Sequence, residues 1–294
     1  MKQLLQAAVT ALEQQKWLDR PSYRLEHGLT LLFAATGGYR DRVSNALHGT
    51  WLGHPLHPAL TSVPTGAVTT TVAMDAASVL PGRAAQLRDA SMFALGVGLV
   101  GSLGAAATGL TDWQHTHEQA RRAGLVHGLL NGVATSLYAL SWWDRRHGRH
   151  ARGMATSALG YGLTLSGGYL GGVLVFGSGT GVDRSGHRLR RGHWTPVLPA
   201  TALDGQPRRV EVDGVGVVLY RTDDRVLAVG ARCPHLGAPM DDGWIDRDRI
   251  VCPWHGSRFA CESGEVLRGP ATVALPHYPT RIREGFVEVR GSVT

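Results

Sequence analysis

The sequence predicts an α+β protein of two domains, in which an N-terminal four-helix transmembrane bundle precedes a small all-β domain. Residues 59–177 contain four long apolar runs that are almost free of charge. After residue 191 the sequence changes to short alternating runs rich in β-branched residues, separated by turn dipeptides. Such a change of composition within 294 residues is typical of two domains.

The apolar runs cover roughly residues 59–80, 91–112, 124–143 and 154–177. Each approaches the ~20 residues that an apolar helix needs to cross a bilayer. Trp113 stands at the end of a run, where an amphipathic ring favours the interface between lipid and water. A soluble bundle of buried helices is the alternative. Four such runs in succession, with charges confined to the connecting loops, favour membrane spans.

The N-terminal region contains shorter elements. Residues 2–17 place apolar side chains at helical spacing, which predicts a short amphipathic helix on a surface. A second apolar patch, 29–35, is too short to span a bilayer, so we expect a surface helix or a half-buried element. The first twenty residues lack an unbroken apolar stretch and a small-residue cleavage site, so we expect no secretory signal. The predicted divisions are an amphipathic segment (1–50), a four-helix membrane domain (51–182), a basic linker (183–193) and the β domain (194–294).

The formal net charge of +7 would suit a nucleic-acid partner. The arginines, however, bunch in short runs between apolar segments, as they do in loops that flank membrane spans, so we expect a lipid bilayer and no nucleic acid. With four spans both termini lie on one side, and the loops of that side carry eight arginines against six. This excess, together with three cysteines that suit a reducing compartment, favours a cytoplasmic β domain.

The C-terminal region predicts a small antiparallel β domain. Asp-Gly, Asp-Asp and Glu-Gly turns separate its short alternating runs. The predicted strands are 209–212, 216–220, 226–229, 280–283 and 286–290. The lone Cys261 lies among them, and we interpret it as a small buried apolar side chain without a role in metal binding.

Two segments of this domain carry the chemistry: Cys233-Pro-His235-Leu-Gly-Ala-Pro and Cys252-Pro-Trp-His255-Gly-Ser, with sixteen residues between His235 and Cys252. They resemble the Rieske family, in which a Cys and a His from each of two facing loops hold a [2Fe-2S] cluster. The resemblance covers roughly residues 194–293 and implies that Cys233 and Cys252 bind the inner iron, whereas His235 and His255 bind the outer one. Two neutral imidazoles in place of thiolates raise the potential above that of all-cysteine ferredoxins. A structural zinc site uses the same residue types, but zinc fingers do not pair these two spacings.

Differences from the quinol-oxidising branch of the family indicate the reduction potential to expect. Quinol-oxidising Rieske proteins carry an extra cysteine in each loop, where this chain has Ala238 and Trp254. They also carry a Ser and a Tyr whose hydroxyls bond sulfur and raise the potential; here Ser257 remains, but Phe259 has no hydroxyl. Fewer hydrogen bonds to sulfur imply a lower, ferredoxin-like potential.

The chain does not resemble a complete Rieske oxygenase. Such an enzyme needs a further large domain with a mononuclear iron, whereas only 39 residues follow His255. The sequence therefore predicts single-electron transfer to or from a separate reductase or oxygenase rather than a stand-alone catalyst.

The apolar half carries a second resemblance. Residues 48–60, His-Gly-Thr-Trp-Leu-Gly-His-Pro-Leu-His-Pro-Ala-Leu, together with Asp75, Asp112-Trp113 and 168–172, look like a family of four-helix bacterial membrane domains of unknown function. Some members of that family are fused to Rieske domains. This resemblance implies a topology and no chemistry.

Several polar side chains fall at the ends of the predicted spans on one side of the membrane, the side from which the fourth span leads to the predicted cluster domain: His54, His57, Asp112, His127 and Asn131. Ionisable groups within spans are costly and are therefore candidates for function. The histidines could ligate a b-type haem or bind a quinone head group; alternatively, Pro-flanked His54 and His57 only cap helices and satisfy carbonyls. Asp75 lies toward the opposite face and is expected to hydrogen-bond a neighbouring helix.

Overall fold

The computed structural model describes residues 2–80, 82, 84–190, 192–222 and 225–291. These residues form seven α-helices followed by eleven β-strands, which confirms the predicted order of a helical region and a β domain. The chain divides into two compact units, Met1–Gly37 with Leu56–Thr180 and Gly38–Pro55 with Gly181–Thr294. It therefore passes between the units at three points.

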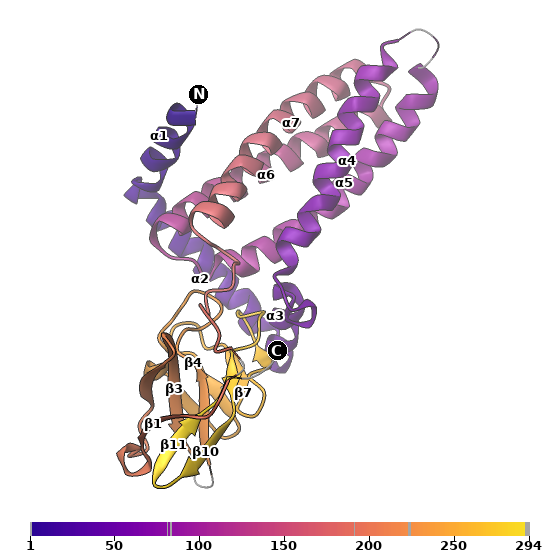
Figure 1. Cartoon of the computed structure of the whole chain (residues 1–294). Coiled ribbons are helices and arrows are strands. Elements are labelled where there is room, and N and C mark those ends of the chain that lie inside the picture. Colours follow the sequence, from indigo (N-terminus) through magenta and orange to yellow (C-terminus); the bar gives the residue numbers. More distant parts are fainter. Residues whose placement is uncertain (1, 81, 83, 191, 223–224, 292–294) are drawn as a thin grey trace. The chain divides into compact units, whose positions relative to one another are not determined.

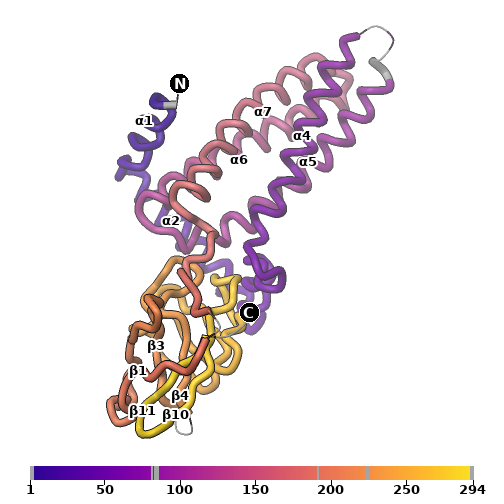
Figure 2. The backbone as a smooth tube through the Cα atoms, in the orientation of Figure 1, coloured from indigo at the N-terminus to yellow at the C-terminus, as the bar shows by residue number. Residues whose placement is uncertain are grey.

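The four predicted runs are helical. They form two antiparallel pairs, α4 with α5 and α6 with α7 (Figures 1 and 2). Their bounds are Leu56–Ser78 for α4, Ala84–Trp113 for α5, Glu118–Arg146 for α6 and His150–Gly172 for α7, with a π-helical turn at Val173–Gly177. Within the described residues, α5, α6 and α7 with its π-helical turn are long and apolar enough to cross a membrane. The count of four spans stays a prediction.

The N-terminal elements pack on the first turn of α6. Helix α1 (Lys2–Glu13) and helix α2 (Asp19–Ala35) are mostly exposed, as predicted for surface helices. The Arg122 guanidinium donates to both carboxylate oxygens of Asp19, at 2.7 and 2.8 Å, and to the Glu13 carbonyl at 2.7 Å. Arg121 donates to Glu26 at 2.5 Å. Two adjacent arginines of α6 thus hold both surface helices.

A buried ion pair joins all four long helices. The Arg145 guanidinium of α6 donates to both carboxylate oxygens of Asp75 on α4, at 2.8 and 2.5 Å, and the two residues are 4% and 6% exposed. Serine hydroxyls complete the network: Ser91 of α5, Ser141 of α6 and Ser157 of α7. Asp75 therefore bonds a neighbouring helix as predicted. The expectation that charges are confined to loops is wrong for Arg145, because this carboxylate draws the guanidinium into the bundle.

We predict that Asp75→Ala destabilises the detergent-solubilised chain by about 3–5 kcal/mol, because it leaves a buried guanidinium without its counter-charge. The double variant Asp75→Leu with Arg145→Met, which removes both charges, should lose less. Thermal unfolding measures both, with Arg146→Ala at the adjacent exposed position as control. A double variant less stable than Asp75→Ala would contradict this prediction.

The second unit is built from three antiparallel sheets. All five predicted strands are present, and six further strands were not predicted. The first sheet is β2 (Arg208–Val212), β3 (Val215–Arg221), β4 (Val226–Gly230) and β9 (His277–Tyr278); the second is β5 (Trp244–Asp246), β6 (Arg249–Val251), β7 (Arg258–Ala260) and β8 (Val266–Arg268); the third is β1 (Thr195–Pro199), β11 (Phe286–Val289) and β10 (Thr280–Arg283). One buried core contains all three cysteines together with apolar side chains of the first two sheets.

Two segments outside the predicted β domain belong to this unit. Helix α3 (Arg40–His48) comes from the region predicted as an amphipathic segment, and the 3₁₀ turn (Thr50–Leu52) spans the predicted boundary between that segment and the membrane domain. Part of the predicted basic linker is also packed: Leu189 is buried in the β core, and its N–H donates to the Tyr278 hydroxyl at 3.3 Å. Arg191, in the same predicted linker, lies outside the described residues.

Candidate functional site

The two predicted cluster segments form loops with the same backbone geometry. The first loop follows β4, and the second joins β6 to β7. In the first, the Gly237 N–H donates to the Cys233 carbonyl at 2.9 Å; in the second, the Gly256 N–H donates to the Cys252 carbonyl at 3.1 Å. Both glycines adopt positive φ, +76° and +68°, a conformation that side chains other than glycine rarely adopt. One further bond closes each loop, from Cys233 N–H to Ala238 and from Cys252 N–H to Ser257, both at 2.9 Å.

The two cysteines meet in the buried core. Cys233 and Cys252 are each 1% exposed, and their thiols lie close enough to interact with each other. This interaction lowers the pKa of the Cys252 thiol and, together with burial, raises the pKa of the Cys233 thiol; for Cys252, burial opposes the shift, and the backbone N–H groups of Trp254 and His255 add to it. Donors aimed at the sulfur favour a thiolate, the form that binds metal.

The two histidines form a second pair beside the cysteines. The ring centroids of His235 and His255 are 5.0 Å apart, and the rings are nearly perpendicular at 89°. Two imidazoles bonded to one tetrahedral metal at about 2.0–2.1 Å have centroids roughly 5 Å apart. Both rings are partly exposed, unlike the cysteines. The observed spacing therefore fits a shared metal ion at the solvent side.

The donor set fits two metal ions better than one. Among the described residues, no group of three or more His, Cys, Asp or Glu side chains converges on a single-ion site. A tetrahedral zinc site needs all four ligands around one point, whereas here the thiols pair with each other and the imidazoles pair with each other. A cluster with one iron on the thiolates and one on the imidazoles matches this arrangement.

Side chains around the loops agree with the sequence interpretation. Ser257 is fully buried, and its hydroxyl oxygen accepts the Ala271 N–H at 3.0 Å, which leaves the hydroxyl hydrogen to donate elsewhere. Phe259 and Cys261 are buried in the apolar core. Burial raises the pKa of the Cys261 thiol, as expected for a residue that acts as a small apolar side chain.

One contact to the first loop was missed by sequence reasoning. The Arg184 N–H donates to the Pro234 carbonyl at 2.8 Å, and the Arg184 Cβ lies 3.6 Å from where a Gly237 Cβ would lie. The predicted linker therefore packs against the first cluster loop and makes a backbone hydrogen bond to it. Because backbone atoms make this contact, no side-chain pattern could have indicated it.

Comparisons with known proteins agree with this geometry. A family model for the Rieske [2Fe-2S] domain matches residues 193–279, which include both loops. The ferredoxin component of the naphthalene 1,2-dioxygenase system of Pseudomonas putida is 34% identical over 86 residues, which are 29% of this chain and 83% of that protein. The chain belongs to the Rieske [2Fe-2S] family. Its cofactor is accordingly a [2Fe-2S] cluster, and its β domain is an electron-transfer domain.

In two further comparisons the matched share of the other protein differs widely. Apoptosis-inducing factor 3 of Mus musculus is 35% identical over 89 residues, which are 30% of this chain and only 15% of that relative. The ferredoxin of carbazole 1,9a-dioxygenase from Nocardioides aromaticivorans IC177 is 26% identical, with a TM-score of 0.33, and the match covers 34% of this chain and 100% of that one.

A second family model covers the helices. The family described as predicted membrane protein (DUF2231) matches residues 53–184. This match confirms the resemblance of the apolar half to a membrane domain of unknown function. Together with the three long apolar helices, it identifies the chain as a membrane protein.

The helical unit brings three of the predicted polar residues together. His57 of α4 bonds through Nδ1 to the Ala105 carbonyl at 2.9 Å, and His127 of α6 bonds through Nδ1 to the Gly167 carbonyl at 2.8 Å. Their ring centroids are 6.3 Å apart, and the Asn131 amide lies 3.5 Å from both ring nitrogens of His127. Since a carbonyl only accepts, Nδ1 carries the proton in each ring. In a neutral ring Nε2 is then the acceptor.

The other predicted members are placed differently. His54 belongs to the second compact unit, where its Nδ1 lies 3.0 Å from the Pro55 carbonyl, as a residue that satisfies a local carbonyl does. Asp112 lies in the last turn of α5.

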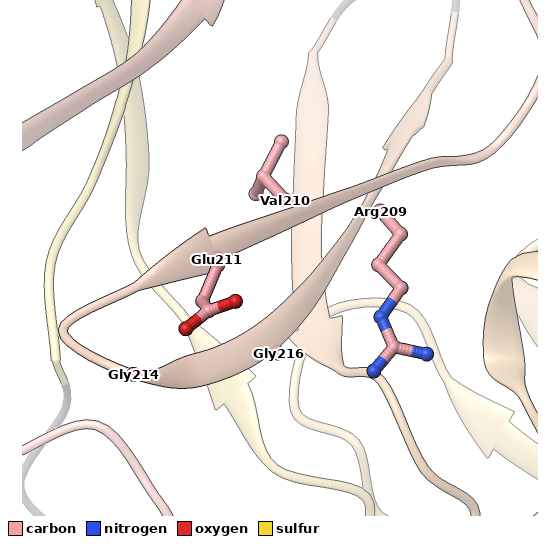
Figure 3. Close-up of a pocket in the computed structure, with 5 residues that line it drawn as sticks. All are labelled: Arg209, Val210, Glu211, Gly214 and Gly216. Atoms are coloured by element: carbon pink, nitrogen blue, oxygen red, sulfur yellow. The ribbon is translucent and has the colours of Figure 1, made fainter.

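A hollow of about 300 Å³ lies on the β2–β3 hairpin, away from both cluster loops in sequence. Figure 3 shows that it is lined by Arg209, Val210, Glu211, Gly214 and Gly216. The alternation of β2 places Arg209 and Glu211 on one face. This lining contains no Cys or His, the side chains that a Rieske-type cluster needs as ligands.

Proposed function

We propose that the chain is a membrane-anchored, ferredoxin-like electron carrier whose cluster is held by Cys233, His235, Cys252 and His255. The two thiolates bind one iron, and the two imidazoles bind the other. The pairing of buried thiols and partly exposed imidazoles in two equivalent loops is the observation that carries this proposal. The partly exposed histidines carry the electron between the outer iron and a partner.

The hydrogen bonds available to the cluster favour a low potential. Ser257 offers one hydroxyl, while the buried Phe259 offers none where the quinol-oxidising proteins have a tyrosine. Each hydrogen bond to sulfur stabilises the reduced, more negative cluster and so raises the potential. This chain therefore lies toward the low end of the range of roughly −150 to +300 mV that Rieske centres span.

The partner is a separate redox protein, a reductase that supplies electrons or an oxygenase that consumes them. The name of the Pseudomonas putida relative, the ferredoxin component of a dioxygenase system, supports this class of partner. The helical unit anchors the carrier with four spans, with α4 as the fourth beside α5, and the Rieske domain faces the cytoplasm. The membrane then serves to concentrate the carrier near a membrane-bound partner.

We predict that the purified full chain shows a Rieske-type EPR signal on reduction, with a low midpoint potential in a redox titration. Phe259→Tyr should raise that potential, because the new hydroxyl can donate to a cluster sulfur. Cys252→Ser and His255→Ala should lose the signal, whereas Cys261→Ser, at a buried cysteine outside the loops, should keep it.

A strongly positive midpoint in the unmodified protein would contradict the ferredoxin-like assignment. Loss of the signal in Cys261→Ser, with retention in Cys252→Ser, would contradict the ligand set.

A second candidate function is a self-contained membrane oxidoreductase that passes electrons between the cluster and a b-type haem or a quinone in the helices. The fixed ring orientations of His57 and His127 favour it, because each Nδ1–H is held by a carbonyl and each Nε2 then has acceptor character, with the Asn131 amide 3.5 Å from that of His127. Gly109 leaves room for the first ring: a Cβ there would lie 2.7 Å from His57 Cε1. These rings have the chemistry to hold a haem iron or to donate to and accept from a quinone.

This second candidate predicts that the purified chain carries either cofactor in the helical unit. A sharp α-band in the reduced visible spectrum identifies haem, and organic extraction with chromatography identifies quinone. Either should be lost in His57→Ala and His127→Ala but kept in the matched control His54→Ala, since His54 lies outside that unit. A wild-type protein with neither cofactor would rule the candidate out.

A further inference from the structure

Helix α3 contacts the end of β8 and the turn that follows it, residues 267–271, which lie more than 200 residues later in the chain. The Asn45 side chain makes two hydrogen bonds there: its Nδ2 donates to the Leu267 carbonyl at 3.0 Å, and its Oδ1 accepts the Gly269 N–H at 3.0 Å. The carboxamide thus pairs with the backbone as a neighbouring strand would. One side chain therefore fixes the start of this turn.

Close packing supports the same contact. Asp41 accepts from Arg268 at 3.1 Å, and the buried His48 lies directly under the turn. A Cβ on Gly269 would lie 3.1 Å from His48 Cδ2, so only glycine permits this approach without displacement. The end of α3 and the turn therefore form one packed element within the second unit.

The turn continues to the second cluster loop. The Ala271 N–H donates to the hydroxyl oxygen of Ser257, which lies two residues after His255 and is fully buried. Because that oxygen is oriented by an incoming donor, the direction of its own hydrogen depends on where residue 271 lies. Asn45 is therefore connected to Ser257 through three consecutive residues, 269–271.

We propose that Asn45 is a positioning residue for the cluster: it holds the turn at 267–271 so that the Ser257 hydroxyl is aimed at a cluster sulfur, and so raises the reduction potential. This inference rests on the proposed cluster ligands and deepens the proposed function. Hydrogen bonds around a metal centre tune its potential when their geometry is fixed. When the Asn45 carboxamide is removed, the turn is released and the Ser257 hydroxyl loses its fixed direction.

Asn45 lies on the segment that leads into the membrane domain, eleven residues before the start of α4 at Leu56. Together with Arg184, which follows α7 and donates to the first cluster loop, it makes both flanks of the membrane domain part of the cluster-binding unit.

The test is a double-mutant cycle on the full chain in detergent, with the midpoint potential and the EPR g-values as readouts. Asn45→Ala and Ser257→Ala should each lower the midpoint, and the double variant should match Ser257→Ala alone, because both changes remove the same hydrogen bond. Asn45→Asp keeps the acceptor for the Gly269 N–H but loses the donor to Leu267, so its shift should be smaller. Amide hydrogen exchange at Gly269 and Ala271, whose N–H groups make the bonds to Asn45 and Ser257, should be faster in Asn45→Ala.

The matched control is Ala46→Gln, at the exposed neighbouring position on α3, which should leave the midpoint and the exchange rates unchanged. An unchanged midpoint in Asn45→Ala, or a double variant whose shift is the sum of the single shifts, would overturn the proposal. If Asn45→Ala does not assemble a cluster, Asn45→Asp carries the same comparison. Absence of a Rieske signal in the unmodified chain would instead refute the proposed function, so the two failures are distinguishable.

Discussion

The pairing of the cysteines with each other and of the histidines with each other is the constraint on which the rest of the Rieske unit depends. In the proposed cluster each iron takes two ligands of one kind and each loop supplies one Cys and one His, so the two loops need matched geometry. The repeated hydrogen bonds from a glycine N–H to a cysteine carbonyl, and the positive φ of both glycines, supply that match. The surrounding sheets keep the thiols buried and the imidazoles partly exposed. The proposed thiolate ligands are thus shielded from solvent, while the proposed imidazole ligands are accessible to a redox partner.

The loops alone do not complete the site. The Asn45 carboxamide, from a segment that precedes all the long helices, bonds the turn that reaches Ser257. Arg184, from the segment that follows them, bonds the first loop. The membrane domain is therefore inserted in the sequence between two segments that both belong to the Rieske unit, rather than attached at one end of it. Its own interior is specified by the pair of Asp75 and Arg145, whose burial is tolerated because three serine hydroxyls complete the donor and acceptor set.

Local patterns in the sequence predicted much of this architecture. The four proposed ligand residues and the interpretation of Phe259 and Ser257 follow from two short motifs, and the long helices follow from apolar runs. The strands of β5 to β8 were not predicted because each has three residues, too few to display alternation. Helix α3 was not predicted because its nine residues are mostly polar and pack through a carboxamide and a buried histidine rather than an apolar stripe. The contacts of Asn45 and Arg145 join residues that are distant in sequence, so the local spacing of apolar and polar residues cannot predict them.

The paired ligation is tested most directly by ENDOR spectroscopy of the reduced full chain, prepared with ¹⁵N-labelled histidine. Two strongly coupled histidine nitrogens are expected, both lost when His235 and His255 are replaced together. A reduced cluster without nitrogen coupling, as in an all-cysteine ferredoxin, would contradict the assignment. A protein that contains one zinc ion and no iron would contradict it equally.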